Sequence, residues 1–258
     1  MRSGGSAVAV HTLTINVATA DGKADSFLAY PDDNAPHPAV LVFSDAFGLR
    51  PVVRRDAERL ATLGFTVLVP NVFYRNGSAP VIELPDFIGA DRRGEIFGAL
   101  RPLLTALTPE LVVADAEAYL SWLADSPLTT GNPVGLSGYC MGVRNALHTA
   151  AAYPDRVAAV AGFHGGRLAT EDPTSPHTVV DRISAEIYLA HADADPGLPP
   201  EQIDRLDAAF TASGTTFRTE VYPGAHHGFT QSDTDVYNAV ADARHWTELA
   251  DLFTRVLR

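Results

Sequence analysis

A strand, a sharp turn and a helix follow one another between Val134 and Tyr153, and this order constrains the fold more than any other feature of the chain. The apolar run from Val134 ends at Gly138, Cys140 comes two residues later, and Gly142 follows after two more. Apolar side chains at helical spacing then predict a helix: Val143, Ala146, Leu147 and Ala150. The glycines are needed because a Cβ atom there would collide with the neighbouring strand or helix. We therefore expect Cys140 to stand above the edge of a sheet.

Cys140 occupies the place of a nucleophile. With serine in the centre, the same pattern is the G-x-S-x-G nucleophile elbow of α/β-hydrolases. A thiol at the start of a helix is favoured as a thiolate by the positive end of the helix dipole and by unpaired N–H groups. The N–H of Met141 is expected to form one half of an oxyanion hole. The alternative is that Cys140 is a small buried apolar side chain, as most free cysteines are.

The remaining pattern alternates strands with helices, which predicts a mostly parallel central sheet with helices on both faces. We expect a flexible leader over residues 1–10 and a single α/β domain over residues 11–258. An Asp21-Gly22 turn predicts an antiparallel opening pair of strands. The irregular residues 71–85 form a loop of a length that is usually functional or mobile. Expected strands are 11–17, 26–30, 39–43, 65–69, 134–138, 157–161, 186–190 and 217–222, and expected helices are 56–63, 91–104, 109–123, 143–153, 200–211 and 235–257.

Composition excludes several classes of function. The net charge of −12 argues against nucleic acid or an anionic membrane surface as the main partner, although a few local arginines would still allow an anionic small substrate. No run of 18 apolar residues suggests a membrane span. The single cysteine excludes an internal disulfide, and no apolar signal-peptide region is present, so we expect a cytoplasmic protein. The sequence does not predict the oligomeric state.

A cysteine nucleophile needs a histidine base and a carboxylate that orients this base. Strand 187–190 is followed by Asp193 and Asp195, and strand 220–222 by His226 and His227. Because the carboxyl ends of parallel strands meet at one edge of the sheet, these side chains are expected near the thiol. Either carboxylate and either histidine fit at this point. A metal site built from His191, Asp193, His226 and His227 is a rival interpretation, but their spacing matches no metal motif.

Four segments together carry a resemblance to the dienelactone hydrolases of the α/β-hydrolase superfamily, which extends over about residues 12–257. They are residues 45–49, 138–142, 195–199 and 222–229. The resemblance implies an α/β-hydrolase fold, with His227 rather than His226 as base and Asp195 rather than Asp193 as acid, and neither a metal nor an organic cofactor.

The same resemblance assigns roles to residues 45 and 46. In the family a glutamate after this strand contacts the resting thiol, and here the acid is Asp45, which is one methylene shorter. The alternative for Asp45 is a turn residue at the end of the strand. The Ala46 N–H is implied as the second oxyanion donor beside that of Met141.

The substrate pocket departs from the family pattern. Family members hold a substrate carboxylate with arginines, yet the position four residues past the catalytic histidine is Gln231. Arg92 and Arg93 stand roughly where another such arginine falls, and Arg144 is expected to make a buried ion pair rather than to touch substrate. The remaining candidate pocket residues are Phe47, Tyr74, Arg75, Tyr139, His164 and Phe229.

The sequence thus predicts a cysteine-dependent hydrolase of small carboxylic esters or lactones. The alternatives are a thioesterase or another small acyl hydrolase, and a non-catalytic or redox-sensing protein on the same fold.

Overall fold

The computed structural model describes residues 9–131 and 133–258, which form an α/β fold around one mostly parallel sheet. The strand order is β1-β2-β4-β3-β5-β6-β7-β8, with β1, β2 and β4 paired antiparallel and the remaining pairs parallel. The strands are β1 (Val10–Thr19), β2 (Gly22–Pro31), β3 (Ala39–Phe43), β4 (Thr66–Pro70), β5 (Val134–Tyr139), β6 (Val157–Phe163), β7 (Glu186–Ala194) and β8 (Phe217–His226). The α-helices are α1 (Pro51–Thr62), α2 (Ala90–Ala106), α3 (Pro109–Asp125), α4 (Met141–Ala152), α5 (Pro200–Ser213) and α6 (Ala239–Leu257).

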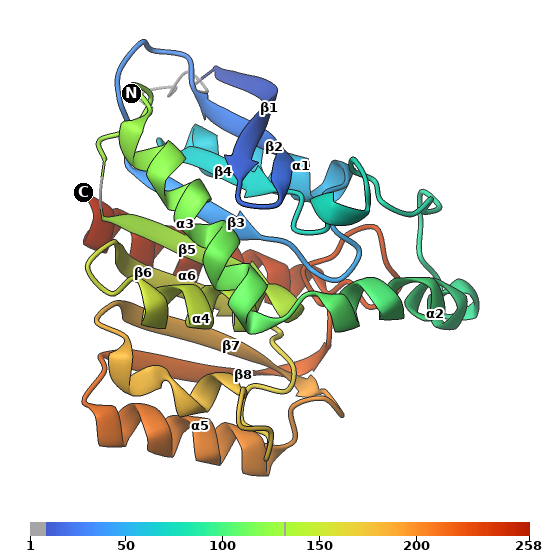
Figure 1. Cartoon of the computed structure of the whole chain (residues 1–258). Helices are drawn as coiled ribbons and strands as arrows, with labels where there is room; N and C mark the ends of the chain where they lie inside the picture. Colours follow the sequence, from blue (N-terminus) through green and yellow to red (C-terminus); the bar gives the residue numbers. More distant parts are fainter. Residues whose placement is uncertain (1–8, 132) are drawn as a thin grey trace, which may run out of the picture.

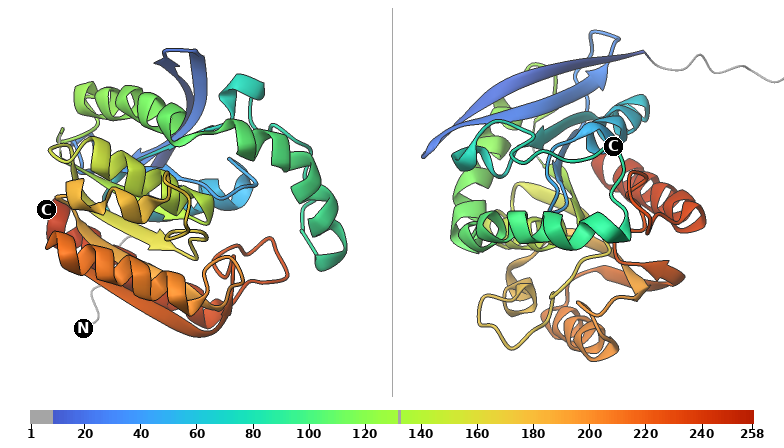
Figure 2. Two further views of the ribbon diagram at one scale, coloured as in Figure 1. Left: turned by 60° about the horizontal axis from the view of Figure 1, so that its bottom comes forward. Right: turned by 90° about the vertical axis from the view of Figure 1, so that its right-hand side faces the viewer.

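Helices cover both faces of the sheet, as the sequence predicts. Helices α3, α4 and α5 pack on one face, and α1 and α6 on the other (Figures 1 and 2). Strand β3 is buried on both faces: Leu41 and Phe43 belong to the core under α3, α4 and α5, and Val40 and Val42 belong to the core under α1 and α6. A continuous apolar run is the pattern expected of a strand that is buried on both sides.

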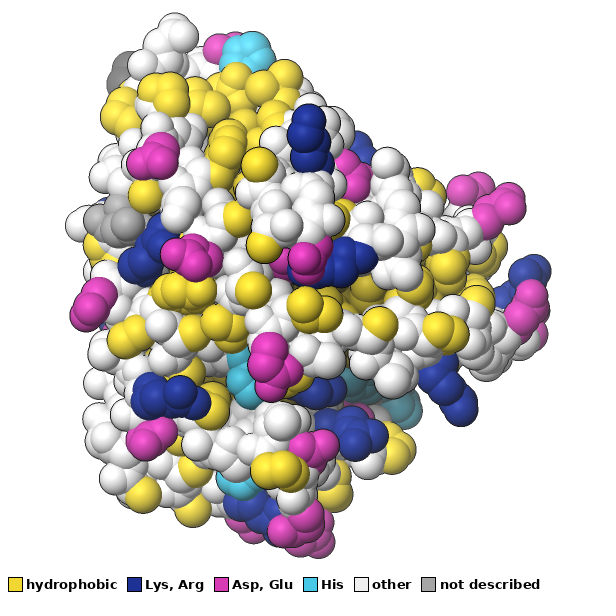
Figure 3. All heavy atoms as spheres, viewed as in Figure 1, with side chains coloured by type: hydrophobic (Ala, Val, Ile, Leu, Met, Phe, Trp, Pro, Cys, Tyr) yellow, Lys and Arg dark blue, Asp and Glu magenta, His cyan; other side chains and the backbone are white. Residues whose placement is uncertain are grey.

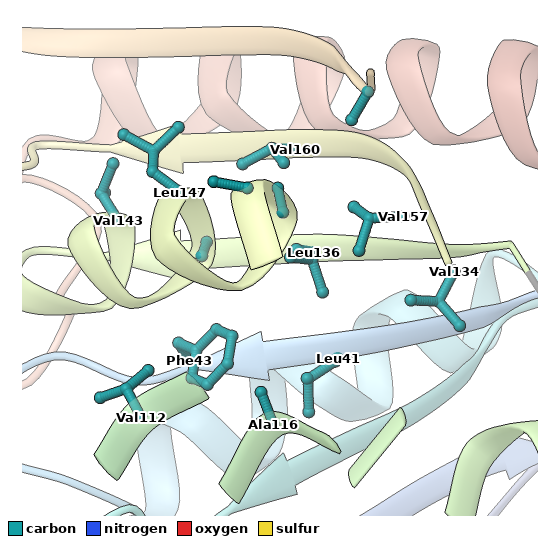
Figure 4. Close-up of a cluster of buried hydrophobic side chains, with 14 of the residues drawn as sticks. Leu41, Phe43, Val112, Ala116, Val134, Leu136, Val143, Leu147, Val157 and Val160 are labelled. Carbon is teal, nitrogen blue, oxygen red and sulfur yellow. The ribbon is translucent and has the colours of Figure 1, made fainter. Parts of the chain in front are cut away.

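Helix α4 is held against the sheet by its apolar stripe. Val143 and Leu147 pack with Leu136 of β5 and Val160 of β6, as the close-up of this core shows (Figure 4). Burial of such side chains is worth about 1.5–3 kcal/mol each. This packing fixes the start of α4, and with it the turn that carries Cys140.

Helix α2 departs from this layered arrangement. It extends outward beyond the carboxyl ends of the parallel strands (Figure 2), and its buried residues Ile96 and Leu100 form a small separate core with Phe47 and Ile88. Over the face that carries α3, α4 and α5, acidic and basic side chains are interspersed (Figure 3).

Several element bounds differ from those predicted. Val10 belongs to β1 rather than to the leader, and residues 1–8 of that leader lie outside the described part of the chain. Helix α1 begins at Pro51, while α6 begins later than expected, at Ala239, with Asn238 as its N-cap. Strands β7 and β8 are longer than predicted, because their apolar runs continue into polar residues that still pair in the sheet.

No described helix is by itself long and apolar enough to cross a membrane, although α2 and α3 pass that test of length and composition together, across a bend of 78°.

Candidate active site

The turn between β5 and α4 places Cys140 in a backbone conformation that is rare for any residue with a side chain. Cys140 is the N-cap residue of α4, with a φ of 54° and a ψ of −116°. A residue in such a strained conformation persists only where the surrounding structure fixes it. A Cβ atom on Gly138 would lie 2.4 Å from the Gly142 carbonyl oxygen, and one on Gly142 would lie 2.2 Å from that of Phe43. Both glycines are therefore required by close backbone approach.

Three side chains from separate loops meet at this turn. The Nε2 atom of His227 lies 3.0 Å from the Cys140 Sγ atom, and its Nδ1 atom lies 2.6 Å from Asp195 Oδ2. The other oxygen of Asp195 accepts the Gly197 N–H at 2.7 Å, which fixes the carboxylate within its own turn. The thiol, imidazole and carboxylate thus form one hydrogen-bonded chain.

The charges within this chain favour a protonated imidazole. Burial opposes the charge on His227, but the negative charge of a Cys140 thiolate and the Asp195 carboxylate outweigh burial and raise the pKa of His227 to about 11. At neutral pH the His227 imidazole therefore favours its protonated form, which places a positive charge 3.0 Å from the Cys140 Sγ atom.

His164 packs against the imidazole of His227. It is fully buried, its ring centroid lies 5.4 Å from that of His227 in an edge-to-face arrangement, and its Nε2 atom is 2.8 Å from Thr230 Oγ1. Burial, followed by the charge of His227, holds the pKa of His164 well below its ordinary value. His164 is thus a neutral support for His227, and it lines neither of the two cavities described below.

Ala46 and Met141, whose N–H groups are the expected oxyanion donors, both line a cavity beside the thiol. The N–H of Met141 belongs to the first turn of α4, where helical N–H groups lack intrahelical acceptors. In the loop after β3, Asp45 accepts the N–H of Phe47 with its side chain and that of Gly48 with its carbonyl group. Among the described residues this leaves the Ala46 N–H without a backbone acceptor, as the predicted oxyanion role requires.

Asp45 is engaged by other partners than the thiol. Its two carboxylate oxygens each accept from Arg50 Nη1 at 2.8 Å, and Gln231 Nε2 donates to Oδ2 at 2.6 Å. Arg50 also binds Asp233, through Nε at 2.6 Å. Among the hydrogen bonds of the described residues none joins Asp45 to Cys140, so this conformation does not show the thiol contact that the family resemblance implies.

Two cavities adjoin Cys140, and Ala46 and Phe97 line both. The first, of about 230 Å³, contains His227 together with Asp45, Phe47, Arg93, Ala194, His226, Gln231 and Val236. The second, of about 160 Å³, contains Met141, Arg144, Asn145 and His148 opposite Leu104, Leu107 and Pro109. Cys140 thus stands between two cavities.

Of the predicted pocket residues, Phe47, Arg93 and Gln231 line the first cavity. Arg93 also pairs with Asp235. Arg92 does not reach either cavity, because it is half-exposed and pairs with Glu95 one helical turn further along.

Tyr74 and Arg75 lie away from the cavities as well. They belong to a short 3-10 turn, Tyr74–Asn76, where the Tyr74 hydroxyl donates to Asp115 at 2.8 Å and Arg75 bridges Asp115 and Asp21. Contrary to the prediction, neither residue lines a cavity beside Cys140, because both side chains pair with the buried carboxylate of Asp115 in α3.

Phe229 and Tyr139 serve the core rather than the pocket. Phe229 is fully buried between His164 and Tyr222, and Tyr139 stacks on Phe163 while its hydroxyl lies 3.0 Å from His245 Nε2. Both residues flank motif positions, but their side chains point to the face of the sheet that α6 covers.

The alternative carboxylate and histidine have other environments. Asp193 lies at the exposed end of β7 and accepts the Gly224 N–H at 2.9 Å. His226 is exposed and lines the first cavity, whereas His191 is buried. Among the described residues no three His, Cys, Asp or Glu side chains are close enough to hold a metal ion.

Two residues of the site, Arg50 and Phe97, were not predicted from the sequence. Arg50, which pairs with Asp45, follows that residue by only five positions, but nothing in the spacing indicated the pair. Phe97 of α2 lines both cavities, whereas no residue of the segment 71–85, all of which is described, lines either.

The fold and this elbow define the class of the α/β-hydrolases. The model of the dienelactone hydrolase family matches residues 24–257, and the chain therefore belongs to that family of hydrolases. A carboxymethylenebutenolidase from Rhodococcus opacus is 26% identical over 235 residues, which cover 90% of this chain and 86% of that protein.

Solved structures agree on the fold. A dienelactone hydrolase-like promiscuous phosphotriesterase from metagenomic libraries superimposes with a TM-score of 0.77 at 23% identity, covering 97% of this chain and all of that one. A dienelactone hydrolase from Anabaena variabilis gives 0.69 at 20% identity, covering 96% of this chain and 99% of the other.

Proposed function

We propose that the protein is a cysteine-dependent hydrolase of small carboxylic esters or lactones, with Cys140 as nucleophile, His227 as acid and base, and Asp195 as the group that orients His227. The single observation that carries this proposal is the continuous chain of contacts from Cys140 Sγ through both nitrogens of His227 to Asp195. This is the arrangement that nucleophilic acyl transfer requires.

The first half of the reaction forms an acyl-enzyme. The Cys140 thiolate adds to the ester carbonyl carbon, and the N–H groups of Ala46 and Met141 hold the resulting oxyanion. When the tetrahedral intermediate collapses, the carbon–oxygen bond to the alcohol breaks, and the His227 imidazolium gives its proton to the departing oxygen. A thioester on Cys140 and a free alcohol, or a ring-opened lactone, result.

The second half releases the acid. Neutral His227 takes a proton from water while the water oxygen attacks the thioester carbonyl, and the thiolate leaves as the acid forms. Asp195 holds the imidazole so that Nε2 faces the thiol throughout. The chain then returns to its thiolate–imidazolium state without any group beyond these side chains and water.

Steady-state hydrolysis by matched variants tests this proposal. Wild type and Cys140→Ala are compared on an ester, a lactone and a thioester of similar size, with Ser121→Ala as a control change at a half-buried position of α3 that lines neither cavity. We expect turnover of the ester and the lactone that Cys140→Ala abolishes and Ser121→Ala preserves. Equal rates in wild type and Cys140→Ala would contradict the assignment of Cys140 as nucleophile. Turnover of the thioester alone would indicate that thioesters, rather than esters or lactones, are the substrate class.

A further inference from the structure

We propose that Arg144, Asn145 and His148 form an anion-binding subsite beside Cys140, which takes a carboxylate at the far end of the substrate's acyl group. This inference rests on the proposed function, since it names the substrate class of that site. It concerns the second cavity beside the thiol, whose polar residues the hydrolytic steps do not use.

The three side chains share one face of α4. Together with Met141 they follow the i, i+3, i+4, i+7 spacing that places residues on one stripe of a helix. The opposite stripe, which includes Val143 and Leu147, packs on the sheet. The polar stripe therefore faces the cavity, whose other wall is apolar and comes from Phe97, Leu104, Leu107 and Pro109.

The polar atoms of this stripe lack partners. Asn145 and His148 are each only 8% exposed, yet the Asn145 Nδ2 and His148 Nε2 atoms have no hydrogen bond to any described residue. The same holds for Arg144 Nε. A buried polar group without a partner is destabilising, and three such groups around one cavity indicate that a ligand completes their hydrogen bonds.

Arg144 is also a cation without a counter-ion. No ion pair within 4.0 Å involves it among the described residues, whereas Arg50, Arg75 and Arg93 are all paired. Burial and then the charge of Arg167 lower the pKa of Arg144, and the nearby Asp172 is exposed and does not reach it as an ion pair. The ion pair that the sequence led us to expect for Arg144 is therefore absent among the described residues, and its guanidinium group is free to bind an anion.

The position of His227 decides which part of the substrate enters this cavity. His227 must protonate the departing oxygen, and it lines the first cavity but not the second. The alcohol part therefore lies in the first cavity and the acyl part in the second. Arg144 follows Cys140 by four residues, about one helical turn, so a short acyl chain reaches it. The substrate class is an ester of a short dicarboxylic acid that keeps one free carboxylate.

Two esters of equal chain length test this subsite: p-nitrophenyl hydrogen glutarate and its uncharged analogue p-nitrophenyl valerate. We expect Arg144→Met to lower kcat/KM for the glutarate ester by about 10- to 100-fold, the loss typical of a hydrogen bond to a charged group, and to change the valerate rate less than about threefold. Arg144→Lys should retain part of the preference. Arg101→Met, which removes an exposed cation on α2, is the control for net charge. Equal losses on both esters would overturn the proposal.

Alkylation of the thiol gives a readout that does not need hydrolysis. Free glutarate should slow the reaction of Cys140 with iodoacetamide in wild type and Arg101→Met, but not in Arg144→Met, with circular dichroism confirming that each variant is folded. Absence of protection in wild type, or equal protection in Arg144→Met, would overturn the subsite even if esters are hydrolysed. Conversely, protection without any Cys140-dependent ester turnover would refute the proposed function and leave the subsite standing.

Discussion

Removal of Arg50 tests how the active-site loop after β3 is held in place. The guanidinium group of Arg50 is 4% exposed and lies between the carboxylates of Asp45, also 4% exposed, and Asp233. Burial raises the pKa of Asp45, and the charge of Arg50 opposes this rise. In Arg50→Met the Asp45 carboxylate keeps its hydrogen bonds from Phe47 and Gln231 but loses its only described cationic partner.

The magnitude follows from what a buried unpaired charge costs. Breaking a buried ion pair by removing one partner typically costs about 3–5 kcal/mol, and a whole domain is stable by only about 5–15 kcal/mol. Asp45→Asn in the same background removes the stranded charge. We therefore expect Arg50→Met to lose about 3–5 kcal/mol, and the double variant Asp45→Asn/Arg50→Met to lose less than the sum of the two single variants.

Urea unfolding followed by circular dichroism measures these free energies. The control is Arg255→Met, which breaks a pair with Glu186 in which the arginine side chain is 52% exposed; exposed pairs contribute no more than about 1 kcal/mol. A loss below about 1 kcal/mol for Arg50→Met, or strictly additive losses in the double variant, would refute the reasoning.

Three further changes test other parts of the account. Gly142→Ala places a Cβ atom 2.2 Å from a backbone oxygen of Phe43, so we expect little folded protein or a loss above about 3 kcal/mol, measured by yield and thermal melting. Burial, followed by the charge of Asp242, raises the pKa of Asp56 from 3.8 to about 7. The folded state therefore keeps a proton on Asp56 that the unfolded state loses, and the free energy of unfolding falls as the pH rises from about 4 to 7. Asp56→Asn should remove this fall and raise the free energy of unfolding at pH 8 by on the order of 2–4 kcal/mol, with little change below pH 4. Asp195→Asn should lower kcat for ester hydrolysis by about 10³-fold or more without unfolding the chain, because the imidazole loses its orienting charge.

Matched controls make these outcomes decisive. A Cβ atom on Gly94 of α2 meets nothing within 4 Å, so Gly94→Ala should leave stability unchanged or raise it by about 0.5–1 kcal/mol; a similar result for Gly142→Ala would contradict the close backbone approach at the elbow. A stability gain from Asp56→Asn that is the same at pH 4 and pH 8 would exclude titration of Asp56 as its cause. Wild-type activity in Asp195→Asn would show that another group orients His227.

The parts of the fold that depend on local pattern were predictable from the sequence. Buried parallel strands such as Ala39–Phe43 read as continuous apolar runs, and the glycines at 138 and 142 marked the elbow. Ligands bind at the carboxyl ends of parallel strands, and this rule predicted that the loops after β5, β7 and β8 lie close together. This rule placed Asp193 or Asp195, and His226 or His227, near Cys140 before any distance was known. The resemblance to the dienelactone hydrolases then selected Asp195 and His227.

Residues that depend on long-range side-chain partners could not be predicted. Arg75 joins Asp115 from 40 positions away, and Arg50 joins Asp233 from 183 positions away, and neither spacing has a sequence signal. For Arg144 the sequence predicted a partner that the structure does not show, because an arginine on a helix is usually expected to pair with a carboxylate. Only the structure shows that no carboxylate of the described residues forms an ion pair with it.

Acid-quenched mass spectrometry during turnover of p-nitrophenyl acetate shows whether Cys140 carries the acyl group. Wild type and Cys140→Ala are quenched in the steady state, and the digested peptides are searched for an added acetyl group. We predict one acetyl group on the peptide that contains Cys140 in wild type, which disappears on chase with buffer, and none in Cys140→Ala. An acetyl group on another residue during turnover, or turnover by Cys140→Ala at the wild-type rate, would contradict this prediction.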